Sequence, residues 1–112
     1  MPDRTAVRRR GAPEKRVQGA IRRALSVLGF QVHDLTQPRA TMLPIGLPDL
    51  YARHTGWRVR LWIEVKAGRR QPTPAQAAWI ADEIAAGGHA IVARSVDDVL
   101  RALREMGAPI DL

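Results

Sequence analysis

The sequence of 112 residues predicts one α/β domain, a mixed β-sheet flanked by helices in the order α-β-β-β-α-β-α. Three observations support this fold class. Segments with apolar side chains at helical spacing enclose segments in which apolar and charged residues alternate. Residues rich in Gly and Pro separate these segments. Apolar residues make up 46% of the chain, enough for one core, and the absence of Cys excludes disulfides and thiolate metal sites.

The first helix is expected over residues 14–28, between Pro13 at its entry and Gly29 at its end. Residues 1–13 contain three consecutive Arg, two Pro and a Gly, and this composition predicts a flexible basic arm. Glu14 lies in line with the apolar stripe of the helix, so its carboxylate is expected to point toward the sheet, where it needs a partner. The stripe consists of Val17, Ala20, Ile21, Ala24, Leu25 and Leu28.

Three strands follow the first helix. They are expected over residues 30–35, 47–53 and 57–66, with a loop over 36–46 and a hairpin turn over 54–56. The third strand has the clearest alternation. One face carries Val59, Leu61, Ile63 and Val65, and the other carries Arg58, Arg60, Trp62, Glu64 and Lys66. The first face therefore points to the core, and the second face places two charged residues next to each other.

The second half of the chain is predicted to add a helix, a strand and a last helix. Thr73-Pro74-Ala75-Gln76 is typical of a helix start with a capping box, and this helix is expected to end at Gly87-Gly88. Its apolar stripe is Ala77, Ile80 and Ile84, which leaves Trp79 on the flank, against the loop or on a dimer or DNA surface. A strand over 89–93 and a helix capped by Ser95 follow, with Val96, Val99, Leu100, Leu103 and Met106 inward. The domain is expected over 14–107, with a tail over 108–112.

The charge of the chain favours a polyanionic partner. The net charge is +7, of which +6 lies within residues 1–23. Such a basic segment is typical of nucleic-acid binding, although a solvated tail that aids solubility is the plain alternative. No apolar run is long enough to span a membrane, and no apolar segment follows the basic terminus, so we expect an intracellular, cytoplasmic protein without a membrane partner.

Three acids and one lysine occupy positions where charge is costly. Asp49 follows Pro48 at the head of a strand, and Glu64 and Lys66 leave the same face of the central strand. Together with Glu14 they would gather carboxylates that repel each other unless a cation lies between them. An all-oxygen set without Cys or paired His favours Mg²⁺ or Mn²⁺. Lys66 is one of only two lysines beside sixteen arginines, which indicates that its position needs an ammonium.

These residues resemble the PD-(D/E)XK nuclease superfamily, and within it the VRR-NUC domain. The resemblance rests on Gly46-Leu47-Pro48-Asp49, on Ile63-Glu64-Val65-Lys66 and on Thr73-Pro74-Ala75-Gln76, with Glu14 and Gln18 on the first helix. It runs from about Glu14 to Leu103. It implies a restriction-endonuclease-like fold and a metal-dependent DNA endonuclease that hydrolyses phosphodiester bonds.

The resemblance also implies roles for the site residues. Asp49 and Glu64 would hold Mg²⁺ or Mn²⁺, with the backbone carbonyl of Val65 as a further ligand and Glu14 through water. Lys66 would orient or deprotonate the attacking water, or stabilise charge on the phosphate. Gln76 would lie near the site, with a pure capping-box role as its alternative; Gln18 is expected at the surface or behind the site.

Other residues are expected to bind DNA rather than to react. Arg8, Arg9, Arg10, Arg69 and Arg70 would contact phosphates, although solvated positions are the alternative for the two loop arginines. Trp62 would stack on a base or simply cover the sheet edge. His33, His54 and His89 are isolated and are expected to be structural or exposed.

By analogy with stand-alone domains similar to this one, which are often phage or bacterial, the resemblance implies a homodimer that acts on branched, Holliday-junction-like or otherwise structured DNA. The rival hypothesis is a non-catalytic nucleic-acid-binding module on the same fold. A purely structural interaction protein is a third possibility. The intact Asp49, Glu64 and Lys66 argue for the nuclease, because a binder does not need three mutually dependent residues.

Overall fold

The computed structural model describes residues 11–36 and 44–111. It has a four-stranded sheet in the order β1-β2-β3-β4, built from β1 (Gln31–Asp34), β2 (Leu50–His54), β3 (Val59–Val65) and β4 (Ala90–Ala93). β1, β2 and β3 pair in antiparallel fashion, and β4 pairs with β3 in parallel. The predicted mixed sheet and element order are confirmed.

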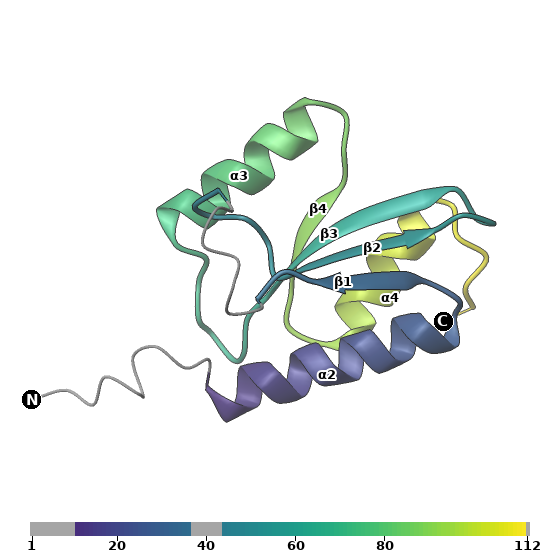
Figure 1. Cartoon of the computed structure of the whole chain (residues 1–112), viewed down its shortest axis with the longest axis horizontal. Coiled ribbons are helices and arrows are strands. Elements are labelled where there is room, and N and C mark those ends of the chain that lie inside the picture. The colour runs from purple at the N-terminus through teal and green to yellow at the C-terminus, as the bar shows by residue number, and fades with distance from the viewer. Residues whose placement is uncertain (1–10, 37–43, 112) are drawn as a thin grey trace, which may run out of the picture.

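Three helices pack on this sheet (Figure 1). α2 (Ala12–Val27) and α4 (Val96–Glu105) cover one face, and α3 (Pro74–Ala85) lies against the other. α3 is the connection that the parallel pairing of β3 and β4 requires. Pro13 stands in the first turn of α2, and Gly29 ends it with a φ of 94°, a conformation that glycine adopts without strain.

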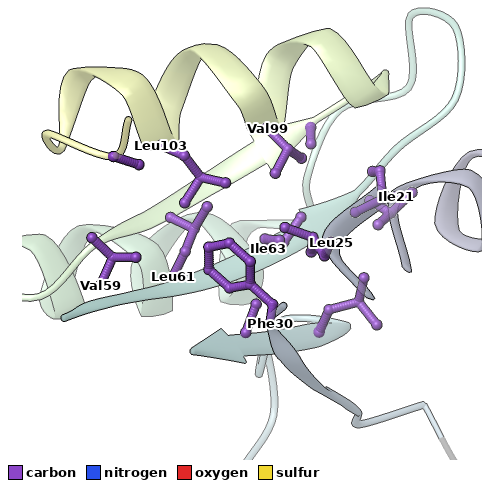
Figure 2. Packing of buried hydrophobic residues seen from close by; sticks show 13 residues of the cluster. Ile21, Leu25, Phe30, Val59, Leu61, Ile63, Val99 and Leu103 are labelled. Carbon is purple, nitrogen blue, oxygen red and sulfur yellow. The ribbon is translucent and has the colours of Figure 1, made fainter. Parts of the chain in front are cut away.

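The core lies between the sheet and the α2–α4 pair, as Figure 2 shows. Every second residue of β3 contributes to it, so the predicted alternation is confirmed for Val59, Leu61, Ile63 and Val65. The other buried members include Ile21, Leu25, Phe30, Leu50, Val99 and Leu103. Ala108 is also buried and Ile110 packs against the core, so packing continues beyond residue 107.

The structure corrects several expectations about the elements. β2 begins at Leu50 rather than at residue 47, because Pro48 has no N–H for the ladder and the Asp49 side chain accepts the N–H of Val65. In α3, Ala77 is exposed and Ile84 is 54% exposed, whereas Trp79 is half-buried. The reason is that the sheet face beneath α3 offers Trp62, and Trp79 packs edge-on against it with 4.9 Å between ring centroids.

Parts of the prediction fall on residues 1–10 and 37–43, which lie outside the described residues; they include Arg8, Arg9 and Arg10. Among the helices that the structure describes, none is both long and apolar enough to span a membrane.

Candidate active site

The candidate active site lies where β2 begins and β3 ends. Asp49 immediately precedes β2, Glu64 is the penultimate residue of β3, and Lys66 follows β3. Leu50 is paired with Ile63, so the same antiparallel register, continued by one residue, sets Asp49 opposite Glu64. All three residues are buried, with exposed fractions of 4%, 0% and 5%. The fold therefore brings Asp49 to Glu64 and Lys66 from another segment of the sequence and shields all three from water.

Asp49 joins the two neighbouring strands through its backbone and its side chain. Its carbonyl accepts the N–H of Leu35 at 2.8 Å, and its carboxylate Oδ2 accepts the buried N–H of Val65 at 2.8 Å. A backbone N–H in this position needs an acceptor, since leaving it unpaired in the interior is costly. Asp49 thus has a structural contact that fixes its carboxylate beside the end of β3.

Glu64 and Lys66 form an ion pair on the same side of the strand. The Lys66 Nζ lies 3.4 Å from Glu64 Oε2, and both side chains are buried. The backbone N–H of Lys66 donates to the carbonyl of Ala93, so β4 holds the lysine in line beyond the strand end. Burying such a pair is costly unless each charge has a partner, so this face of β3 differs from an ordinary solvated face.

Glu14 and Gln18 extend the buried polar region onto α2. Glu14 is 3% exposed, and its Oε1 lies 3.1 Å from the guanidinium of Arg70. Gln18, one turn later, is 7% exposed and donates to Asp34 Oδ2 at 3.2 Å. The expected inward direction of Glu14 is confirmed, and of the two positions expected for Gln18, at the surface or behind the site, burial excludes the surface. The spacing of four residues between them already places both side chains on one helix face.

Arg94 is a residue of this region that the sequence analysis missed. Its guanidinium donates to the backbone carbonyls of Gly68 and Arg70, at 2.9 and 2.6 Å. Its own backbone N–H donates to Asp98 in the first turn of α4. Arg94 therefore fastens the loop after Lys66 to the end of β4. Parallel pairing of β3 with β4 places the residues that follow the two strands side by side, and this pairing could have indicated that Arg94 lies near the loop after Lys66.

The structure places the loop residues Arg69 and Arg70 and the helix residue Gln76 in different surroundings. Arg69 is exposed, and Arg70 is 64% exposed in its side chain while it pairs with Glu14. The Gln76 side chain accepts the N–H of Thr73 at 2.8 Å, and the Thr73 hydroxyl accepts the N–H of Gln76. This is the capping box that the sequence left open as the alternative role of Gln76.

Gly46, which opens the Gly-x-Pro-Asp motif, has a steric role at this site. Its φ is 88°, and a Cβ built on it would lie 2.6 Å from the backbone carbonyl carbon of Ala75 in α3. Only glycine permits this approach. The motif therefore lets the loop before Asp49 pack directly on the first turn of α3.

The chemistry of the donor set fits a hard divalent cation. Within residues 11–36 and 44–111, no group of three or more His, Cys, Asp or Glu is placed to hold a metal ion. The residues present offer two opposed carboxylates, Asp49 and Glu64, on the rigid end of a sheet. Mg²⁺ is commonly bound through one or two carboxylates while it keeps several waters, so a pair of oxygen donors suits it better than a dedicated cage.

Comparison with solved structures finds VRR-NUC domains. A structure titled "VRR_NUC domain" matches with a TM-score of 0.66 and 22% identity, over 88% of this chain and 98% of that one. A "VRR_NUC domain protein" matches with a TM-score of 0.64 and 25% identity, over 87% of this chain and 89% of that one. No protein-family model and no curated protein matches the sequence. The two solved structures show that this chain has the fold of VRR-NUC domains over most of its length.

Proposed function

We propose that this chain is a metal-dependent DNA endonuclease that hydrolyses phosphodiester bonds. The observation that carries the proposal is the burial of Asp49, Glu64 and Lys66 at the adjoining ends of β2 and β3. A non-catalytic binder would present cations to phosphate and would not bury two carboxylates among them. Similarity to VRR-NUC structures supports the same conclusion.

In this proposal Asp49 and Glu64 hold Mg²⁺ or Mn²⁺, with the carbonyl of Val65 as a further ligand and Glu14 acting through water. The bound cation would make water more acidic and offset the negative charge that develops on the phosphate. The Val65 N–H orients the Asp49 carboxylate by its hydrogen bond. Lys66, held by Glu64, would as an ammonium orient the attacking water or neutralise phosphate charge, or would as the neutral amine accept the proton of that water.

Glu14 of α2 also forms an ion pair with Arg70, so α2 helps to position a basic side chain near the site. The Arg70 side chain is 64% exposed, so the pair presents a positive group to solvent while the buried Glu14 fixes its direction. We propose that Arg70 and Arg69 contact the DNA backbone, and that the active unit is a homodimer acting on branched DNA in the cytoplasm of a bacterial or phage-infected cell. A dimer would place two sites for two strands.

The test is cleavage of supercoiled plasmid and of a four-way junction with Mg²⁺, Mn²⁺ or EDTA. We expect cleavage with either metal and none with EDTA. Glu64→Gln should abolish cleavage, and the matched control Glu105→Gln, at an exposed position of α4, should cleave like the wild type. Circular dichroism and a melting curve establish that Glu64→Gln is folded. DNA binding without cleavage under all conditions, by a folded wild-type protein, would instead support the binding module.

A further inference from the structure

A cavity opens near the start of β3, toward the opposite end of this strand from Glu64 and Lys66. Its volume is about 300 Å³, and it lies between the β2–β3 hairpin, the sheet face and the C-terminal end of α3. The lining includes Tyr51, Trp62, Arg58, Arg60, Glu83 and His89. This combination of aromatic rings with two guanidinium groups differs from an ordinary apolar groove, and none of these residues is used by the proposed cleavage chemistry.

The aromatic wall of the cavity continues directly from the active site. Tyr51 and Trp62 are a cross-strand pair whose ring centroids lie 4.5 Å apart, and the two rings belong to the same sheet face as Asp49 and Glu64. Trp79 packs edge-on against Trp62 and holds its ring from the α3 side. Each ring is two residues along its strand from a site carboxylate, a separation of about 6.6 Å. The two rings therefore lie between the cavity and the site carboxylates on one face of the sheet.

The charged side chains of the cavity suit a nucleotide. Arg58 and Arg60 are exposed at the far end, about 13 Å from Glu64 for Arg60 at the usual strand rise. Guanidinium groups contact phosphates, and aromatic rings stack on bases regardless of sequence. The carboxylate of Glu83 offers an acceptor for an exocyclic amino group of a base. The volume is at the lower end of the range for small-ligand sites, which fits one nucleotide and excludes a duplex.

The backbone of Arg58 is a second, independent sign of function. Its φ is 60°, the left-handed region, and within the described part of the chain it is the one residue other than glycine in that region. Its N–H donates to the carbonyls of His54 and Thr55, so the turn requires this conformation. Gly or Asn would adopt it more readily than Arg. Residues other than glycine are uncommon in this region, and such backbone conformations cluster at functional sites.

We infer that this cavity binds an unpaired nucleotide of the DNA substrate, so that the protein prefers DNA in which a single strand adjoins a duplex. The inference rests on the proposed function for its choice of DNA. The base stacks on Trp62 and Tyr51, and its phosphate contacts Arg58 and Arg60. At about 3.4 Å per stacked nucleotide, the bound nucleotide lies two to four positions from the scissile phosphate.

The experiment measures binding by fluorescence anisotropy in EDTA, where metal-dependent cleavage is absent. Three labelled probes are compared: a blunt duplex, the same duplex with a four-nucleotide dA overhang, and that overhang with abasic sites in place of its bases. The wild type should bind the dA overhang about tenfold more tightly than the blunt duplex, and the abasic probe should lose most of this gain because its phosphates remain but its bases are gone.

The decisive variant is Arg58→Gly, with Arg58→Asn beside it. Both suit the left-handed backbone, so the melting temperature should stay the same or rise, while the preference for the overhang falls severalfold. Arg23→Ala, at an exposed position on α2, removes the same charge elsewhere and should keep the preference. Trp62→Leu should remove the difference between the dA and abasic probes.

The outcomes separate the two proposals. Equal binding of the blunt and overhang probes by the wild type, or an unchanged preference in a folded Arg58→Gly protein, would overturn the nucleotide pocket, whether or not the protein cleaves DNA. If Arg58→Gly loses the overhang preference while the wild type cleaves no DNA with Mg²⁺ or Mn²⁺, the proposed nucleotide pocket stands and the proposed nuclease function is overturned.

Discussion

Asp49 has two roles that two substitutions can separate. Its carboxylate accepts the Val65 N–H at 2.8 Å, and it is also a proposed metal ligand. Asp49→Ala removes both functions. Asp49→Asn keeps a side-chain oxygen as an acceptor for the N–H but removes the negative charge that would bind the cation.

The structure sets the expected magnitudes. Val65 is fully buried, so in Asp49→Ala its N–H loses its partner in the interior, at a cost of about 1–3 kcal/mol in the free energy of unfolding. For a domain of this size each kcal/mol lowers Tm by about 4–8 °C. Asp49→Asn should stay within about 1 kcal/mol of the wild type. Mutation of a residue that only hydrogen-bonds to a metal ligand typically reduces activity roughly 10–100-fold. Because Asp49 is proposed to bind the metal directly, both variants should lose more cleavage activity than that.

The assay combines urea unfolding with single-turnover cleavage at saturating DNA and Mg²⁺. The expected pattern is loss of activity in both variants and loss of stability in Asp49→Ala alone. DNA binding in EDTA should persist in Asp49→Asn, or tighten, because a carboxylate that repels phosphate is gone.

Two results would refute this reasoning separately. Wild-type cleavage by Asp49→Asn would show that the carboxylate does not hold the metal. Equal stability of the two variants would show that the hydrogen bond to Val65 does not support the fold. Neither result depends on the identity of the natural DNA substrate.

The remaining predictions concern Lys66, Arg94, Gly46 and residues 1–10. Lys66→Arg should reduce single-turnover cleavage about 10²–10⁴-fold although the charge is kept, because a guanidinium stays protonated and cannot accept a proton from the attacking water; wild-type turnover would reduce Lys66 to an electrostatic contact. Arg94→Ala should increase hydrogen exchange in the loop over 67–70 and reduce cleavage, whereas unchanged exchange would show that its two bonds to the loop are dispensable. Gly46→Ala should lower the free energy of unfolding by about 1–3 kcal/mol, since its Cβ would meet the backbone of Ala75; a melting curve like that of the wild type would contradict this close approach. Deletion of residues 1–10 removes four arginines and should reduce the log–log salt slope of DNA binding by roughly 3 to 4 units, with single-turnover cleavage at saturating DNA little changed; an unchanged slope would identify a solvated tail.

The sequence by itself determined those features that depend on local periodicity and local caps. Alternation in residues 59–65 predicted the central strand and its core face, and Pro13, Gly29, Thr73 and Ser95 predicted helix ends. These signals are short-range, because each side chain acts on its own turn or strand. The order and spacing of Asp49, Glu64 and Lys66 predicted which residues gather, since a strand places alternate residues on one face.

Only the tertiary structure decided which polar groups meet across the sheet. The contacts of Gln18 with Asp34 and of Arg94 with the loop after Lys66 join segments that no periodicity relates. The apolar stripe of α3 was expected to face inward and Trp79 to lie on its flank. Instead Trp79 packs inward, because Trp62 lies on the sheet face beneath α3. Such contacts depend on strand register and on where a crossover helix packs, and these are settled by burial over the whole domain rather than by any one segment.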